Sequence, residues 1–324
     1  MEHLNLNLSC NQNCMFCILD RFHGKNRRFV KEDSRQGISI EQAKEKIDRI
    51  ADNKITDVLT FLGAEPTVRP GLIELVDYAR QKNIKIIEIS TNCIKLADKD
   101  YARKLIHAGV DRIVTSLHSY KPKLCDKIVG VKGNFNKIIA GIKNSIELGV
   151  DLRITHVIFS QNYRDILSFI RFCEKNFPKI IYQENMEPFT FLYLQSPVII
   201  EKAEKERIDW IRKQMPRFSE TSPYIYEAMK YLKSKQIRFT VEGIPLCYLK
   251  GFFENSIDFH EALDDKIVHI KQDPNSSEIL HAKTFLDLRS KGIECQFCSK
   301  NNLCYGAWQE YVQLYGTGEF IPIL

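Results

Sequence analysis

Hydrophobic residues along the chain follow two spacings, one typical of strands and one typical of helices. Near the N-terminus, Leu4, Leu6 and Leu8 alternate with polar residues, which predicts a strand with one buried face. Short apolar runs predict further strands at residues 58–62, 84–89, 113–117, 152–159 and 180–184. Apolar residues at helical spacing predict the intervening helices at 40–50, 70–81, 98–107, 134–148 and 162–177.

Two of these helices carry start signals. Ser39 and Gln42 have the spacing of a capping box, and Asn134 is expected to cap its helix, with Gly149 just past the end. The strand–helix alternation is repeated six times, which requires parallel strands joined by right-handed crossovers. Six units are too few for an eight-fold closed barrel. The predicted fold is therefore α/β, a partial (β/α)6 TIM-like barrel.

The pattern changes beyond Pro188. Helices are predicted at 201–215 and 222–233 and a last strand at 238–241, after which the chain from Gly243 is irregular and contains cysteines. We expect a boundary near residue 240, which separates a barrel core at 1–240 from a cysteine-rich extension at 241–324.

Composition narrows the class of protein. The chain of 324 residues is 44% hydrophobic and 27% charged, as in an ordinary soluble protein, and its net charge of +6 permits an anionic substrate without demanding nucleic acid. We find no signal peptide and no apolar run long enough to span a bilayer, so we expect a cytoplasmic protein without a membrane partner. In that setting the ten cysteines predict metal ligands and buried thiols rather than disulfides.

Three cysteines follow the first strand directly. Cys10, Cys14 and Cys17 have the spacing C-x3-C-x2-C, so they can converge on one centre with little loss of chain entropy. Soft sulfur ligands favour iron–sulfur or zinc. Three ligands rather than four leave a coordination position open, which is typical of a site for chemistry.

This stretch resembles the radical S-adenosylmethionine (radical SAM) superfamily, in which Phe16 matches the usual aromatic residue before the last cysteine. The resemblance implies a 4Fe–4S cluster on the three cysteines, with its fourth iron chelated by the amino and carboxylate groups of S-adenosylmethionine (SAM). It also implies an open three-quarter barrel. In such enzymes an electron from a flavodoxin- or ferredoxin-type donor cleaves SAM to a 5′-deoxyadenosyl radical, which takes a hydrogen atom from the substrate.

Further motifs at strand ends support the resemblance. Gly63-Ala64-Glu65-Pro66 is similar to the Gly-Gly-Glu-Pro motif that receives the SAM amino group, with Ala64 in place of the second glycine. Ser90-Thr91-Asn92 is similar to the segment near the SAM ribose and carboxylate, although Cys93 replaces the glycine that usually follows. Ser116 matches a position that binds the SAM carboxylate. Each of these residues taken alone could equally cap a helix or stabilise a turn.

Residues that could face the substrate follow the fourth strand. His118, Cys125 and Asp126 are the catalytic candidates, although a lone histidine is more often structural. The basic segment at residues 20–37 follows the first strand and is either a solvated loop or a loop that meets an anionic substrate.

A second cysteine group lies in the extension. Cys295, Cys298 and Cys304 have the spacing C-x2-C-x5-C, and Cys247 supplies a fourth thiolate from another loop. Four cysteines fit a fully ligated iron–sulfur cluster or a structural zinc of the ribbon type. Beside the N-terminal motif, the arrangement resembles a twitch domain, the shorter relative of the SPASM extension. That resemblance implies one auxiliary 4Fe–4S cluster, which would accept an electron and make the reaction a net oxidation.

The sequence is compatible with several classes of substrate. We expect an oxidoreductase or maturase that modifies a ribosomal peptide, for example by crosslinking; a carbohydrate, an aminocyclitol or a nucleotide is the alternative. Only nine residues precede Cys10, so a leader peptide would bind directly or through a separate leader-binding protein. A zinc-stabilised scaffold that binds nucleic acid is the non-enzyme alternative. The three-ligand site, the Gly63–Pro66 motif and the lack of a concentrated basic stripe speak against it.

Overall fold

The computed structural model describes residues 2–17, 37–196, 200–263, 268–270, 279–281 and 288–324. The basic segment predicted at 20–37 lies outside the described residues except for Gly37. In the part of the chain described, no helix is long and apolar enough to cross a membrane.

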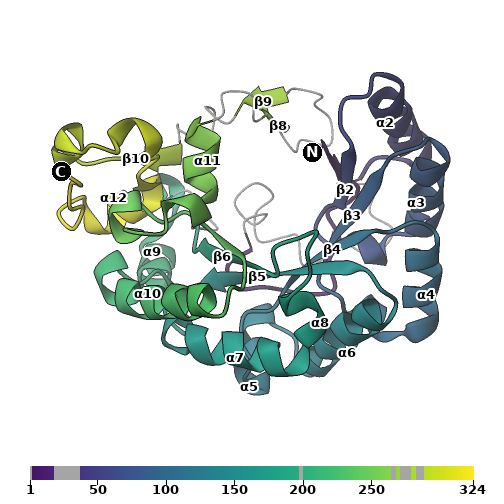
Figure 1. Ribbon diagram of the computed structural model, residues 1–324, viewed down its shortest axis with the longest axis horizontal. Helices are drawn as coiled ribbons and strands as arrows, with labels where there is room; N and C mark the ends of the chain where they lie inside the picture. Colours follow the sequence, from purple (N-terminus) through teal and green to yellow (C-terminus); the bar gives the residue numbers. More distant parts are fainter. Residues whose placement is uncertain (1, 18–36, 197–199, 264–267, 271–278, 282–287) are drawn as a thin grey trace.

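Seven parallel strands form the central sheet. They are β1 (Glu2–Asn5), β2 (Val58–Leu62), β3 (Ile86–Thr91), β4 (Arg112–Ser116), β5 (Asp151–Ile158), β6 (Phe189–Tyr193) and β7 (Phe239–Glu242). Each strand pairs with its neighbour in sequence, in the order β1 to β7, and no pairing of β1 with β7 closes the sheet among the described residues. The sheet curves into an open arc (Figure 1). The predicted partial TIM-like barrel is confirmed.

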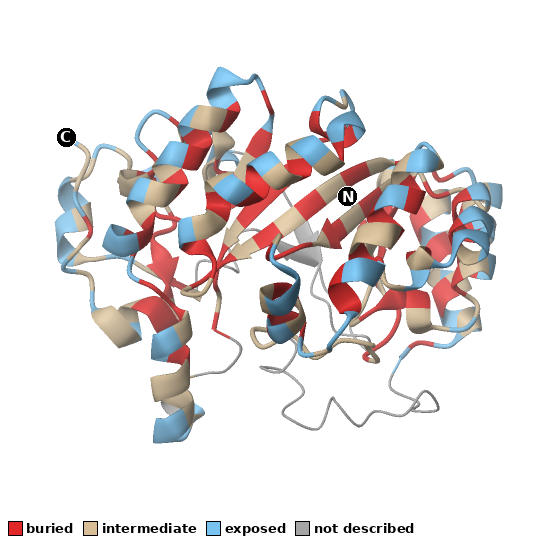
Figure 2. Cartoon of the chain, turned by 90° about the horizontal axis from the view of Figure 1, so that it is seen from below, coloured by how far each residue is buried: buried red, intermediate tan, exposed pale blue. Residues whose placement is uncertain are grey.

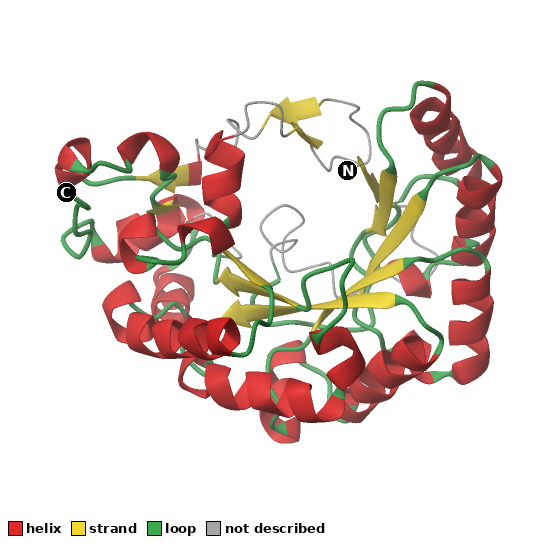
Figure 3. Cartoon of the chain, in the orientation of Figure 1, coloured by secondary structure: helices red, strands yellow, loops and turns green. Residues whose placement is uncertain are grey.

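Helices cover the convex side of this arc (Figure 3). They are α2 (Ile40–Asp52), α3 (Leu72–Gln81), α4 (Lys99–His107), α5 (Pro122–Val129), α6 (Asn134–Glu147), α7 (Ile166–Asn176), α8 (Pro178–Ile181), α9 (Lys205–Gln214) and α10 (Phe218–Ser234). The predicted capping box is present, since Ser39 Oγ accepts from Gln42 N at 3.1 Å and Gln42 Oε1 accepts from Ser39 N at 2.8 Å.

Two local predictions were wrong, and one helix was missed. Residues 180–184 do not form a strand: Pro178 starts the short helix α8, and the sixth strand is β6, built from the aromatic-rich run Phe189–Tyr193. Asn134 is not the cap of α6, because Gly133 occupies that position and makes no side-chain cap. The helix α5 was not predicted at all.

Burial alternates along β1, β4, β5 and β7 and defines two faces of the sheet, whereas β2, β3 and β6 each contain three consecutive buried residues (Figure 2). In β5, Leu152, Ile154, His156 and Ile158 are buried, whereas the residues between them are partly exposed. The buried set packs in the core cluster with helix residues such as Phe169 of α7. The alternate residues of β5 therefore face the hollow of the arc.

The chain after β7 is mostly irregular. Residues 243–263 and 288–324 lie beside the β6–β7 end of the sheet, whereas the short hairpin between them lies toward β1 (Figure 1). This part of the chain contains α11 (Ile257–Leu263), the hairpin β8 (Val268–Ile270) with β9 (Ile279–His281), the antiparallel pair β10 (Arg289–Ser290) with β11 (Ala307–Trp308), and α12 (Gln309–Tyr315). A backbone bridge joins Val241 of β7 to Ser256. Because β7 runs to Glu242, residue 240 lies within the sheet, and the division at 240 stays a prediction.

Candidate active site

A cavity of about 310 Å³ lies at the C-terminal ends of the strands. Most residues predicted from the motifs line it together: Cys10, Cys14, Phe16, Cys17, Gly63, Ala64, Glu65, Ser90, Thr91, Asn92, Ser116 and His118. Of the motif residues, Pro66 is buried beside the lining but does not belong to it. The structure therefore brings four separate sequence motifs to one site, as the carboxyl ends of parallel strands should.

The loop that carries the first three cysteines is held by α5. Backbone N–H groups of Asn13 and Met15 donate to the carbonyls of Val129 (2.9 Å) and Ile128 (3.0 Å) at the end of that helix. Gly130 follows with a left-handed φ of 70°, and a Cβ there would lie 2.4 Å from the Asn13 carbonyl oxygen. The unpredicted helix thus sets the position of the cysteine loop.

The sulfur atoms of this loop have polar neighbours. Cys10 Sγ accepts from the backbone N–H of Gln12 at 3.3 Å, and the Cys14 thiol contacts Gln12 Oε1 at 3.4 Å. Among the described residues, no group of three or more histidine, cysteine, aspartate or glutamate side chains is close enough to hold a single metal ion. Three cysteines on one cavity wall, on a loop fixed by backbone contacts, do fit the ligand set of an iron–sulfur cluster, whose own bulk separates its ligands.

Glu65 is buried and its carboxylate is fully engaged. Oε1 accepts from the backbone N–H and the hydroxyl of Thr67 and from the hydroxyl of Thr91 (2.6 Å), and Oε2 accepts from Asn92 N at 2.7 Å. Burial raises the pKa of this carboxyl, and the four hydrogen bonds oppose that rise. Glu65 therefore ties the turn after β2 to the turn after β3.

The same turn contacts the approach to the cysteines. Ala64 N donates to the Asn7 carbonyl at 2.9 Å, and Glu65 N donates to the Ser9 carbonyl at 3.0 Å. At Gly63, whose φ is 154°, a Cβ would lie 2.5 Å from Asn7 Oδ1. Cys93, which replaces the family's usual glycine, adopts a positive φ of 60°, so the backbone keeps the conformation that glycine favours.

His118 lines the cavity and is held in a neutral state. Its Nδ1 accepts from the backbone N–H of Val157 at 3.2 Å, and its ring lies edge-on to Phe16 with centroids 4.8 Å apart. Burial lowers the pKa of His118 to about 3. Behind it, His156 bonds the Leu117 carbonyl through Nδ1 and Asn162 Nδ2 through Nε2, and burial lowers its pKa to about 4.

The other two catalytic candidates are not at the cavity. Both oxygens of Asp126 accept backbone N–H groups, from Gly133 at 2.6 Å and from Phe135 at 2.8 Å, so Asp126 caps α6. Cys125 is buried in α5, and burial raises its pKa to about 12. The structure therefore supports only His118 among the three as a group in reach of a bound molecule.

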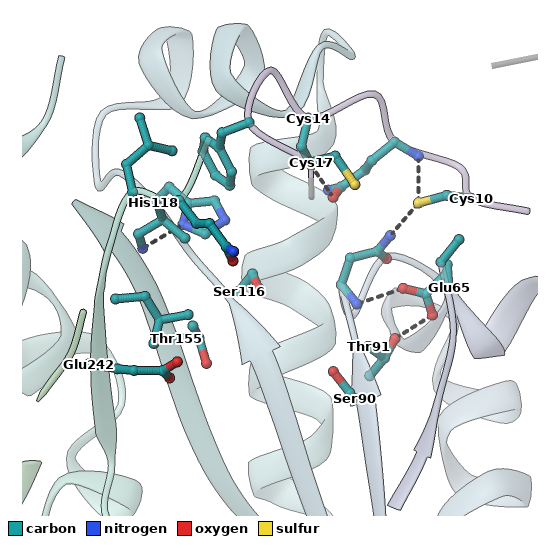
Figure 4. A pocket seen from close by; sticks show the side chains of 18 of the residues that line it. Cys10, Cys14, Cys17, Glu65, Ser90, Thr91, Ser116, His118, Thr155 and Glu242 are labelled. Atoms are coloured by element: carbon teal, nitrogen blue, oxygen red, sulfur yellow. Dashed lines mark hydrogen bonds between the residues drawn. The ribbon is translucent and has the colours of Figure 1, made fainter. Parts of the chain in front are cut away.

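The end of the cavity away from the cysteines was not predicted. Figure 4 shows Thr155 and Glu242 together there. The remaining lining residues that sequence reasoning missed are Gln12, Val157, Leu192, Tyr193, Leu194, Gln195 and Trp308. Glu242 is the last residue of β7, so the barrel rule could have found it once the strand bounds were known, whereas Thr155 lies three residues before the end of β5 on its partly exposed face.

Trp308 reaches this cavity from the C-terminal extension and is held by a buried ion pair. The guanidinium of Arg289 lies 3.5 Å from the centroid of the Trp308 ring and 2.9 Å from Asp258 Oδ1. Asp258 Oδ2 in turn accepts from Gly243 N at 3.0 Å. These contacts fix part of the cavity wall to the turn that follows β7.

The four C-terminal cysteines line a second, small cavity together with Lys291. Cys304 Sγ accepts from Leu246 N (3.5 Å) and Gly306 N (3.4 Å), and Cys298 Sγ accepts from Ile323 N at 3.3 Å. Burial raises the pKa of Cys247 to about 11. Four half-buried cysteines, two of which accept backbone N–H groups at sulfur, fit a group that binds and neutralises thiolates, either an iron–sulfur cluster or zinc.

The family of the chain follows from comparison with known proteins. The model of the radical SAM superfamily matches residues 4–173, which include the cysteine loop and the first five strands, and the chain belongs to this superfamily. It is therefore an enzyme of a family that uses a 4Fe–4S cluster and SAM.

Relatives in sequence match about half of the chain. A probable GTP 3′,8-cyclase of Saccharolobus islandicus is 33% identical over 173 residues, which are 52% of each chain. An Fe-coproporphyrin III synthase of Methanosarcina barkeri is 33% identical over 179 residues, 55% of this chain and 42% of the other. The matches thus span about half the length of these curated relatives.

Solved structures match the fold over nearly the whole chain. SuiB of Streptococcus suis gives a TM-score of 0.63 at 19% identity and covers 99% of this chain and 75% of its own. The enzyme anSMEcpe, bound to AdoMet and the Kp18Cys peptide, gives a TM-score of 0.62 at 13% identity and covers 100% of this chain and 92% of its own. These likenesses extend over the cysteine-rich extension as well as the barrel.

Proposed function

We propose that this radical SAM enzyme oxidatively modifies a ribosomal peptide, for example by crosslinking. One observation carries the proposal: a second group of four cysteines lies next to the catalytic cavity. Cys304 lines the small cavity, and Trp308, four residues later, lines the large one. A fully ligated site so close to the substrate is suited to accept an electron.

The residues divide into two sets by role. Cys10, Cys14 and Cys17 would hold the SAM-binding cluster, and Cys247, Cys295, Cys298 and Cys304 would hold an auxiliary 4Fe–4S cluster. With these groups and SAM bound, the site supplies a 5′-deoxyadenosyl radical for hydrogen abstraction and an acceptor for the remaining electron. Contacts to SAM are assigned to Phe16, the 63–66 turn, Ser90, Thr91, Asn92 and Ser116. The chain itself orients the reactants and excludes water.

Two lines of support favour a peptide substrate. SuiB was crystallised with its precursor peptide SuiA and anSMEcpe with a peptide, and both share the fold of the present chain along its length. The described residues that line the cavity include the carboxylate of Glu242 and no lysine or arginine. The proposal includes a cytoplasmic location, a flavodoxin- or ferredoxin-type electron donor and a leader that binds directly or through a separate protein.

A nucleotide is the second candidate substrate, ahead of a carbohydrate or aminocyclitol. It is favoured by the relatives in sequence, which include a probable GTP 3′,8-cyclase at 33% identity. A triphosphate is normally bound by lysine or arginine side chains, and the cavity lining described above lacks them. We therefore rank the peptide first.

Two measurements test the proposal. The anaerobically reconstituted wild type should contain about eight irons with matching sulfide, and the Cys10/Cys14/Cys17→Ala variant about four. Zinc at the C-terminal site would contradict the auxiliary cluster. The reduced enzyme should then form 5′-deoxyadenosine together with a peptide that has lost hydrogen, when given small peptides encoded beside its gene. Conversion of GTP, with no change in any such peptide, would contradict the peptide assignment.

A further inference from the structure

His118 has a fixed orientation and a fixed proton. Because the backbone N–H of Val157 donates to Nδ1, that nitrogen presents a lone pair, and the proton of the neutral ring is on Nε2. The two ring nitrogens point in nearly opposite directions. With Nδ1 bonded to β5, the Nε2–H group points away from the strand, toward the cavity that the ring lines.

The surroundings keep the ring in place. Phe16 packs edge-on against it, and Asn162 Nδ2 donates to the His118 carbonyl at 3.0 Å and to the Val157 carbonyl at 2.8 Å. Asn162 thereby ties together the two backbone segments that the His118–Val157 hydrogen bond also joins. The ring is 3% exposed, so it cannot turn toward bulk water without losing these contacts.

The ring also lies at the end of the cavity where the cofactor must bind. Phe16 directly precedes Cys17, and Figure 4 shows His118 on the cavity wall below the cysteine loop, with Ser116 nearby. SAM has to reach the three-cysteine centre, and its carboxylate and ribose hydroxyls are oxygen acceptors. A base would need a free lone pair, which this ring does not offer.

We propose that Nε2–H of His118 is a fixed hydrogen-bond donor to an oxygen atom of bound SAM. His118 is then a SAM-binding residue and not a general base. The inference rests on the radical SAM site but not on the peptide substrate, so its test is independent of which substrate the enzyme takes.

Two substitutions separate a donor role from a packing role. His118→Gln keeps an N–H group near the position of Nε2 but loses the ring, whereas His118→Phe keeps a ring against Phe16 but loses the donor. The measurement is the Kd for SAM by anaerobic equilibrium dialysis on reconstituted holoenzyme, with iron content and thermal midpoint checked for each variant.

For His118→Gln we expect a Kd for SAM within about threefold of the wild-type value. For His118→Phe we expect a Kd raised by about tenfold or more, because this variant loses one hydrogen bond to a charged or polar oxygen. The opposite order would assign the ring a packing role and overturn the proposal. Equal Kd values for both variants and the wild type would also overturn it. Whether peptide or GTP is converted does not enter either result.

Discussion

The hydroxyl of Thr91 donates a hydrogen bond of 2.6 Å to the carboxylate of Glu65, and this contact joins the ends of two neighbouring strands. Glu65 lies in the turn after β2 and Thr91 ends β3, so the pair fixes the relative position of two loops that line the cavity. Asn92, whose N–H also bonds Glu65, reaches on to Asn11 Oδ1 at 2.7 Å in the cysteine loop. Glu65 therefore links the turn after β2 to the end of β3 and, through Asn92, to the cysteine loop.

Replacement of Glu65 by glutamine should destabilise the protein. The amide would present N–H groups to Asn92 N or Thr91, so at least one buried donor loses its acceptor, at a cost of roughly 1–3 kcal/mol. Thr91→Val removes one donor to Glu65 and also the acceptor of Cys93 N, so it should cost about 1 kcal/mol for each hydrogen bond lost. Urea unfolding of both variants measures the difference. If Glu65→Gln unfolds at the wild-type urea concentration, the carboxylate does not hold the two turns together.

Gly130 should be essential for the cysteine loop. Alanine there adds a Cβ that would lie 2.4 Å from the Asn13 carbonyl oxygen, so the loop has to move. Gly149 is the matched control, because its φ of 87° is also left-handed but nothing lies within 4 Å of its Cβ position. Both variants should lose about 1 kcal/mol from backbone strain.

Only Gly130→Ala should bind less iron at the N-terminal site. Iron and sulfide content after reconstitution measures this, in a background where the C-terminal cysteines are replaced by serine. Equal iron in the Gly130 and Gly149 variants would show that the α5 contact does not position the loop.

His156 should make stability depend on pH. Burial lowers its pKa in the folded protein to about 4, against roughly 6.5 in the unfolded chain. The unfolded chain therefore binds a proton first as the pH falls. The contribution of His156 is fully present above about pH 6.5 and is lost toward pH 4, at about 1.4 kcal/mol per pH unit.

The measurement is the free energy of unfolding in urea between pH 7 and pH 4.5 for wild type and His156→Gln. The variant should have the shallower slope with pH. Parallel slopes for wild type and His156→Gln would contradict a neutral buried ring.

Removing one partner of the Arg289–Asp258 ion pair behind Trp308 should destabilise the protein more than replacing both partners. Arg289 and Asp258 are 3% and 6% exposed, so Arg289→Met leaves a buried carboxylate and should cost about 3–5 kcal/mol. The double variant Arg289→Met/Asp258→Asn should cost less than the sum of the two single variants. Lys85→Met, in the exposed pair with Asp57, should change stability by at most about 1 kcal/mol.

Sequence reasoning located most strands and the cofactor end of the cavity because both depend on local signals. The apolar runs at 58–62 and 152–159 match β2 and β5 closely, and the cysteine spacing pointed to the site of the first loop. The failure at 180–184 has a physical cause. The adjacent residues Ile180 and Ile181 fit a strand or a buried helix equally. Pro178 favours the helix because proline is well suited to the first helical position.

The substrate end could not be predicted because its residues come together only in three dimensions. Trp308 is 66 positions from Glu242 in sequence, and no local pattern marks either as lining a cavity. The role of Asp126 was hidden for the same reason. It caps a helix that starts eight residues later, so its hydrogen bonds to Gly133 and Phe135 follow no standard capping spacing.

The open arc has a consequence for solubility. A parallel sheet that does not close leaves edge strands whose unpaired backbone groups can recruit another chain. At the β7 edge, Ser256 bridges to Val241, and Asn255 Nδ2 donates to the Phe239 carbonyl at 3.1 Å. The segment at residues 243–256 thus covers part of this edge against intermolecular strand addition, so aggregation would accompany its loss even in a chain whose barrel core is intact.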